Sequence, residues 1–130
     1  MPADVDVIWY GNHQPDPALD RSLEETLLRA MPEIEWSVKN QARMHSRNEH
    51  RPYLSTADAV RHWPETATAV AVRLAEEQIE ILAPFGLEDL FALIVRPTFA
   101  FTDRLDVVMA RASQKNWFIR WPRLRLVSTT

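Results

Sequence analysis

Glycine is scarce in this chain, with only Gly11 and Gly86 among 130 residues. Loops that wrap backbone around phosphate, such as the Walker loop and the dinucleotide-binding turn, need several glycines at fixed spacing. Both kinds of nucleotide-binding fold are therefore excluded. The hydrophobic fraction of 46% and the charged fraction of 25% are those of an ordinary globular protein, and the length predicts a single domain over residues 1–130.

Charge and composition exclude several other classes. The net charge of −3 gives no overall basic field for nucleic acid, although a local basic cluster lies near the C-terminus at Lys115, Arg120, Arg123 and Arg125. The lack of cysteine excludes disulfides, thiolate zinc sites and cysteine nucleophiles. No apolar run reaches the roughly 20 residues of a membrane helix. Since residues 1–6 also lack the features of a secretory signal, we expect a cytoplasmic protein with no membrane partner.

The first third of the chain predicts a strand, a helix and a second strand. Residues 5–10 are β-branched and aromatic, and their apolar part from Val7 to Tyr10 predicts a strand covered on both faces. Asp16 followed by Pro17 is typical of a helix start. Residues 17–31 then repeat apolar side chains at helical spacing, namely Leu19, Leu23, Leu27 and Ala30. Alternation over 33–39 predicts the second strand, and residues 40–45 either continue it or form a short helix.

The remaining elements are shorter. Residues 55–58 resemble a capping box that opens a helix ending near Trp63. Period-two runs over 66–74 and 78–82 favour a hairpin around Glu76 and Glu77, with a helix as the rival interpretation of the first run. Further helices are expected over 87–94 and over 102–116, the latter capped by Thr102 or Asp103. The tail over 117–127 is expected to pack back across the domain.

Two carboxylates open the first strand. Asp4 and Asp6 are two residues apart, so their side chains project from the same face and repel each other, which a divalent cation relieves. The alternative is that both are solvated surface acids. Glu80 lies between Ile79 and Ile81 and either completes a three-carboxylate set or faces solvent.

Other polar and aromatic groups leave two interpretations each. Lys39, Asn40, Arg43 and His45 either face a phosphate or base, or bond to neighbouring backbone. The tryptophans at 36, 63, 117 and 121 are interpreted as packing residues rather than platforms for base stacking.

Several strings together resemble a known family. They are DVDV at 4–7, WSVKNQARMH at 36–45, PY at 52–53, WPETAT at 63–68, APFGLEDLF at 83–91 and RP at 96–97. In this order they are similar to bacterial predicted nucleotidyltransferases of the polymerase-β-like superfamily, formerly a domain of unknown function. The resemblance spans Asp4 to about Trp121. It implies an α+β fold, a minimal palm with a small mixed sheet flanked by helices.

The resemblance also implies a site and an activity. Asp4 and Asp6 become expected catalytic ligands of Mg²⁺ or Mn²⁺, with Glu80 as a third carboxylate. The expected reaction moves a nucleotidyl group from a nucleoside triphosphate to an unidentified acceptor. Among the cations, Lys39, Arg43 and Arg73 are candidates for phosphate contacts. Nucleic acid is a conceivable acceptor that the overall charge does not indicate.

The sequence departs from the family at its start. Family members begin with an upstream helix and a glycine-containing turn that resembles a triphosphate grip, whereas here Asp4 follows Met1 by three residues. We therefore expect an N-terminally shortened domain, with an exposed sheet edge or apolar face that favours a homodimer. The alternatives are a catalytically degenerate module that binds a nucleotide or a protein, and a truncated gene product.

Overall fold

A computed structural model describes residues 4–12 and 16–128 of the chain. Residues 1–3, which belong to the segment expected to lack a secretory signal, lie outside this part. The chain divides into two compact units, Met1–Ala59 and Val60–Thr130, and each unit is described by itself. The single domain expected over residues 1–130 stays a prediction. Within the described residues, no helix is long and apolar enough to cross a membrane.

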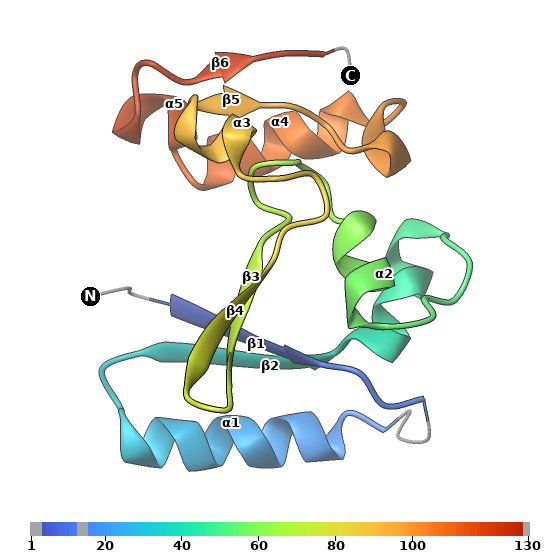
Figure 1. The fold of residues 1–130 in the computed structure, drawn as a ribbon, viewed down its shortest axis with the longest axis vertical. Coiled ribbons are helices and arrows are strands. Elements are labelled where there is room, and N and C mark those ends of the chain that lie inside the picture. Colours follow the sequence, from blue (N-terminus) through green and yellow to red (C-terminus); the bar gives the residue numbers. More distant parts are fainter. Residues whose placement is uncertain (1–3, 13–15, 129–130) are drawn as a thin grey trace. The chain divides into compact units, whose positions relative to one another are not determined.

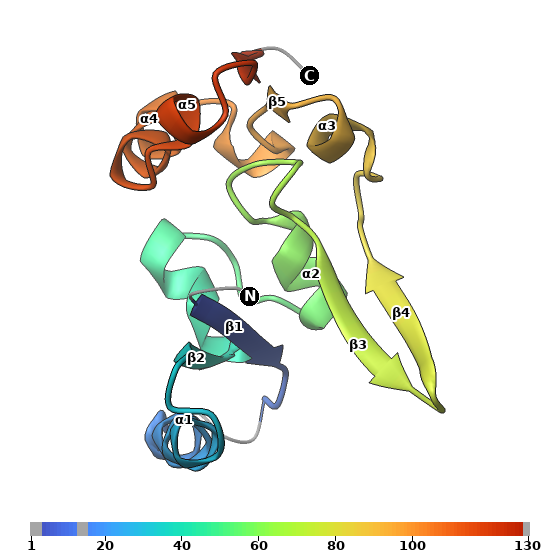
Figure 2. The ribbon, with the colours of Figure 1, turned by 90° about the vertical axis from the view of Figure 1, so that its left-hand side faces the viewer.

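The N-terminal unit is built on two parallel strands joined through a helix. Strand β1 (Asp4–Trp9) pairs with β2 (Glu35–Asn40), and helix α1 (Ala18–Ala30) connects them. Figures 1 and 2 show α1 running beside β2, with β1 on the far side of that strand. The predicted strand–helix–strand order is confirmed. The helix begins one residue later than predicted, with Pro17 at the N-cap position, and Asp16 before it accepts a hydrogen bond from the Ala18 amide (2.9 Å).

The inward face of α1 differs from the predicted one. Leu19 and Leu23 are both 41% exposed, whereas Asp20 is buried and Glu24 is half-buried. The carboxylates of Asp20 and Glu24 accept hydrogen bonds from the backbone N–H groups of Asn40 (3.0 Å) and Val38 (2.8 Å). A covered backbone donor at a strand edge needs a partner. The need of β2 for acceptors therefore turns two acids, rather than the leucine stripe, toward the strand.

Strand β1 is also less covered than predicted. Asp4 and Asp6 are exposed, and the residues from Val7 to Tyr10 are half-buried rather than buried. The opposite strand β2 carries the buried side chains of Val38 and Asn40. The coverage predicted for Val7 to Tyr10 is therefore only partial, since side chains on both faces of this run are half-buried.

Two short helices follow β2. The open choice for residues 40–45 resolves to a 3-10 helix, η1 (Gln41–Asn48), whose first turn is capped by the Asn40 side chain. The expected capping box at the next helix, α2 (Thr56–Arg61), is confirmed. Ser55 Oγ accepts from the Asp58 amide (3.0 Å), and Asp58 Oδ2 accepts from the Leu54 amide (2.9 Å).

The C-terminal unit contains the predicted hairpin of β3 (Ala71–Ala75) and β4 (Gln78–Leu82), which pair antiparallel. The first strand begins later than predicted, at Ala71 instead of Thr66. The hydroxyl of Thr66 bonds to Asp89 (2.5 Å) and that of Thr68 to Glu65 (2.6 Å). These side-chain bonds hold the preceding segment in a turn instead of a strand.

The rest of this unit is made of short elements. They are α3 (Glu88–Phe91), β5 (Ile94–Val95), η2 (Phe99–Phe101), α4 (Leu105–Gln114), α5 (Trp117–Arg120) and β6 (Arg125–Leu126). The helix predicted over 87–94 ends early because Leu93 adopts a left-handed conformation (φ 59°). The tail does pack back within its unit, since β6 pairs parallel with β5. The expected cap of α4 is wrong: Arg104 occupies that position, and the Thr102 hydroxyl bonds to Phe99 O instead.

Each unit has its own buried apolar residues. Ile34, Val38, Tyr53 and Ala59 are buried in the N-terminal unit, whereas Val60, Val95, Phe101, Val108 and Ala112 are among those buried in the C-terminal unit. Among the described residues the strands form three two-stranded pairs, two parallel and one antiparallel. The predicted α+β class, with small sheets flanked by helices, is confirmed.

Candidate functional site

The expected carboxylate pair lies on one face of β1. Asp4 and Asp6 are both exposed and alternate with the half-buried Val5 and Val7. Because alternate residues of a strand share a face, the two carboxylates project to the same side. Neither forms an ion pair with another residue in the described part of the chain. The pair is therefore open to a ligand.

Strand β2 extends this face. Asp4 lies opposite Glu35, Asp6 opposite Ser37 and Ile8 opposite Lys39. Side chains of residues directly opposite in a pair of strands share a face, so Glu35 adds a third acid and Lys39 a cation. In the sequence, Glu35 is only one polar residue of the alternating run over 33–39, which gives no sign of a role in a site. No three acids or histidines gather closely enough to hold a metal within residues 4–12 and 16–128.

Two aspartates fit a divalent cation of the magnesium type. Mg²⁺ in proteins is held by oxygen ligands, commonly one or two carboxylates together with waters and substrate phosphates. An exposed pair on a strand meets that requirement without a third protein ligand. Asp4 and Asp6 would hold such an ion, and Lys39 lies on the same face, two residue pairs beyond Asp6.

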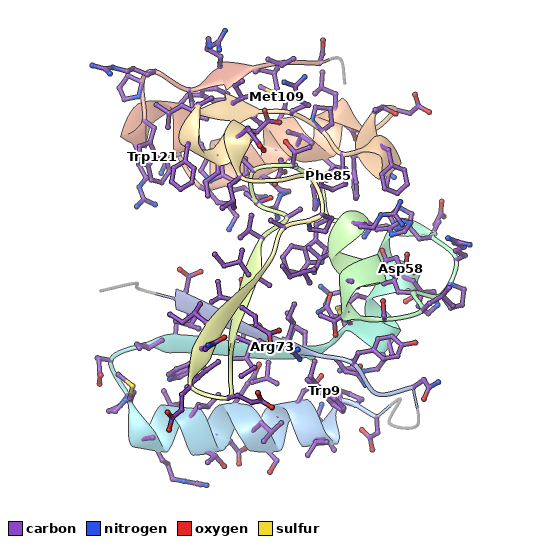
Figure 3. The ribbon with its side chains drawn as sticks, in the orientation of Figure 1. Trp9, Asp58, Arg73, Phe85, Met109 and Trp121 are labelled. Atoms are coloured by element: carbon purple, nitrogen blue, oxygen red, sulfur yellow. The ribbon has the colours of Figure 1, made fainter. Side chains whose placement is uncertain are left out.

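Arg43, a candidate for phosphate binding, is committed to another group. Its Nη2 donates to Asp20 Oδ2, and the Asp20 side chain is 5% exposed. Asp20 also accepts from Trp9 Nε1 (2.7 Å), and Trp9 points toward α1 in Figure 3. The sequence analysis gave no role to Asp20, and an acid between two leucines of a helix gives no signal of burial.

The WSVKNQARMH string at 36–45 thus has a structural explanation for part of its length. Asn40 accepts from the Gly11 amide (3.1 Å) and donates to the Gly11 carbonyl (2.9 Å), which fixes the end of β1 against β2. Arg43 compensates Asp20. His45 lies edge-on to Tyr53, with ring centroids 6.1 Å apart. A phosphate- or base-facing role for His45 stays a prediction.

Glu80 and Arg73 form an ion pair in the C-terminal unit. Arg73 on β3 faces Glu80 on β4, with Arg73 Nη2 2.8 Å from Glu80 Oε2 and side-chain exposures of 74% and 52%. Glu80 therefore has a cation as its neighbour in the described structure. Asp4 and Asp6 belong to the other unit, so a shared three-carboxylate set stays a prediction.

Comparisons with known proteins agree with this reading of the fold. A nucleotidyltransferase family model matches residues 1–126. The chain is similar to a solved NMR structure that is described as revealing a CCA-adding enzyme head domain. The similar region covers 97% of this chain and 68% of the chain of that structure. The sequence identity is 37% and the TM-score is 0.83. No curated protein sequence matches the chain.

The fold and the carboxylate-bearing strand together define a nucleotidyltransferase domain of the polymerase-β-like class. The chain belongs to the nucleotidyltransferase family. The resemblance seen in the sequence is therefore confirmed, and membership supports nucleotidyl transfer in general.

Proposed function

We propose that this protein is a metal-dependent nucleotidyltransferase that moves a nucleotidyl group from a nucleoside triphosphate to an acceptor hydroxyl. The observation that carries the proposal is the exposed pair Asp4 and Asp6 on one face of β1, neither of which forms an ion pair with a described residue, in a chain of this family. A divalent cation, Mg²⁺ or Mn²⁺, would neutralise charge on the triphosphate when bound.

The protein's own residues have defined tasks in this scheme. Asp4 and Asp6 hold and orient the cation–triphosphate complex on β1, and Lys39 donates to a phosphate oxygen. The acceptor oxygen forms a bond to the α-phosphorus, the bond to the bridging oxygen breaks, pyrophosphate leaves, and the hydroxyl proton is released. Positioning and electrostatics are the main contributions a protein makes to such a transfer.

Lys39 is favoured over Arg43 on energetic grounds, and over Arg73 because it lies on the same face as Asp4 and Asp6. If Arg43 turned to a phosphate, Asp20 would be left buried and uncompensated, and breaking a buried pair costs about 3–5 kcal/mol. Arg73 is exposed, and its pair with Glu80 contributes only about 0–1 kcal/mol. Arg73 and Glu80 can therefore exchange partners easily, which keeps Glu80 in the proposal as a third carboxylate.

Calorimetric titration of Mg²⁺ and of Mn²⁺, with and without ATP or CTP, tests the site. Wild type should bind the nucleotide in a metal-dependent manner, and the Asp4→Asn/Asp6→Asn variant should lose this binding because neutral amides do not replace carboxylates as ligands. The matched control is Asp103→Asn/Asp106→Asn, which removes two exposed aspartates elsewhere and should bind as wild type.

A second pair of variants tests the role of Lys39 in binding phosphate. Lys39→Gln should weaken nucleotide binding about 5- to 150-fold, the range for loss of a charged hydrogen bond of roughly 1–3 kcal/mol, while Arg29→Gln on α1 should not. Equal metal-dependent binding by wild type and the Asp4/Asp6 variant would refute the assignment. Absence of binding in wild type would favour the alternative, a catalytically degenerate module. The homodimer and the cytoplasmic location expected from the sequence stay predictions.

A further inference from the structure

A cavity of about 320 Å³ lies within the C-terminal unit. Its walls are mostly apolar and come from the segment after α2, from α3 and β5, and from the C-terminal segment. The residues that the inference uses are Glu65, Thr68, Asp89, Trp117, Trp121 and Leu124. A volume of this size, with apolar walls and a few polar groups, is typical of a small-ligand site.

Two tryptophans form part of the wall. Trp117 opens α5 and is half-buried, and Trp121 directly follows this helix and is 43% exposed. Figure 3 places Trp121 at the α5 end of the unit. An exposed indole beside a cavity offers a flat surface on which another aromatic ring can stack. Both tryptophans therefore keep part of their indole surface exposed in addition to the part that packs against the protein.

The polar groups of the wall are acceptors held in place. Glu65 is 1% exposed, and its two carboxylate oxygens accept from Arg111 at 2.8 and 3.1 Å. Asp89 accepts from Arg96 (2.9 Å). Glu65 also accepts from the Thr68 hydroxyl (2.6 Å), so Asp89, whose side chain is 20% exposed, is the acid that can accept from an N–H group of a ligand. Because each acid has an arginine partner, the wall has no net negative charge that would repel an anion.

Cations stand next to the tryptophans. The Arg120 guanidinium lies 4.6 Å from the ring centroid of Trp121, and Arg123 and Arg125 flank the lining residue Leu124. All three arginines are exposed. From residue 105 to 128 Asp106 is the only acid. This side of the unit therefore combines an aromatic cavity with a local excess of positive charge, although the whole chain has a charge of −3.

The cavity thus has an exposed indole, hydrogen-bond acceptors in its wall and arginines beside it. A flat ring that carries N–H donors and is joined to phosphates matches all three. We propose that the cavity binds a base at the end of a single-stranded nucleic acid, stacked against Trp121, with the adjoining phosphates on Arg120, Arg123 and Arg125. Base stacking on aromatic side chains beside a basic groove is the usual design for single strands. The inference identifies the acceptor of the proposed transfer as a single-stranded nucleic acid. This identification rests on the proposed function, whereas binding of the nucleic acid does not.

Fluorescence anisotropy with a labelled single-stranded RNA of about six nucleotides tests the inference, in EDTA so that no metal takes part. Wild type should bind the RNA. Trp121→Ala should weaken binding about 5- to 150-fold, and Trp121→Phe should retain most of it because a ring remains. Arg120→Gln should weaken binding and make its dependence on salt less steep. Ile119→Ala, an exposed position of α5 outside the cavity wall, and Arg29→Gln should bind as wild type.

The outcomes separate the alternatives. Binding by Trp121→Ala equal to that of wild type, or no binding by wild type, would overturn the inference. Competition by AMP or CMP as strong as that by the RNA would also overturn it, because the cavity would then serve free nucleotides. Circular dichroism of each variant establishes that it is folded, and if Trp121→Ala is not folded, Arg120→Gln decides the matter, since unchanged affinity and salt dependence in that variant would overturn the inference. The Asp4→Asn/Asp6→Asn variant should still bind RNA, so the proposed function and this inference fail separately.

Discussion

Asp20 is a buried residue of the N-terminal unit on which three hydrogen bonds from other segments converge. Its carboxylate accepts from Trp9 on β1, from the Asn40 amide on β2 and from Arg43 on η1. Helix α1, which carries it, is thereby tied to three other segments. A single buried carboxylate with a charged partner is costly to neutralise, because the cation is then left without compensation.

Asp20→Asn should lower the free energy of unfolding by about 3–5 kcal/mol, since the amide keeps the shape but leaves Arg43 uncompensated. Urea unfolding followed by tryptophan fluorescence measures the change. The control is Asp16→Asn, an exposed cap at which asparagine serves as well as aspartate, and it should change stability by less than about 0.5 kcal/mol. A loss below about 1 kcal/mol for Asp20→Asn would contradict the importance given to this contact.

Asp89 is expected to make stability depend on pH. Its hydrogen bond from Arg96 holds the pKa of the carboxyl below its usual range, against an opposing effect of burial. A lowered folded-state pKa contributes stability that is fully present above the unfolded-state pKa of about 3.9. This contribution is lost as the pH falls through the folded-state pKa.

Asp89→Asn should therefore melt at a lower temperature than wild type at neutral pH, and the difference should shrink as the pH falls below about 4. Thermal unfolding by circular dichroism over this range measures it. Asp106→Asn serves as the control because its contact with Arg104 is long (3.7 Å) and its side chain is 76% exposed. A difference between Asp89→Asn and wild type that stays constant with pH would count against the ion-pair explanation.

At the scale of the element, the β3–β4 hairpin has a strained turn. Glu76 and Glu77 adopt φ values of 50° and 65°, which makes the connection a two-residue turn with both residues in the left-handed region. Such turns favour Asn-Gly because other residues have steric strain there. The sequence predicted the hairpin in spite of this unfavourable pair, and the pairing of Ala75 with Gln78 fixes the loop length.

Glu76→Asn/Glu77→Gly should stabilise the hairpin by about 1–2 kcal/mol by removing this strain. Hydrogen exchange of the β3 and β4 amides measures the local effect, as slower exchange. The control variant, Glu76→Gln/Glu77→Gln, removes the two charges but keeps the strained backbone and should change exchange little. If both variants slowed exchange equally, repulsion between the glutamates rather than backbone strain would be the cause.

At the scale of the whole molecule, the homodimer expected from the sequence has surfaces available in the N-terminal unit. Within the described residues β1 pairs with β2 alone, so its other edge carries no strand. On α1, Leu19 and Leu23 lie one turn apart on the same face, and both are 41% exposed. Unpaired strand edges and clustered exposed leucines both favour association with another chain.

Light scattering after size exclusion should give twice the chain mass of 15.1 kDa at micromolar concentration. Leu19→Lys/Leu23→Lys should give the monomer mass, because two charges on the contact face would have to be buried. Leu54→Lys, at a 72% exposed position of the same unit away from α1, should remain dimeric. A wild-type chain that stays monomeric as its concentration is raised would refute the dimer.

The sequence by itself determined the local elements and the family. The strands of the N-terminal unit, α1, the capping box at Ser55 and the hairpin all follow from periodicity and turn chemistry, which involve neighbours in the chain. The placement of Asp4 and Asp6 on one face follows from the same local geometry. The similarity of long strings such as that at 36–45 gave the family, and through it the fold class.

Only the tertiary structure decided which groups meet. Asp20 bonds across 20 residues to Asn40, and Glu65 across 46 residues to Arg111. No local pattern encodes such partners. The leucine stripe of α1 predicted the wrong inward face because the free N–H groups of β2 needed acceptors, and a donor that burial would leave unpaired outweighs a modest apolar preference. The cavity beside Trp121 likewise exists only where α3, β5 and the C-terminal segment come together.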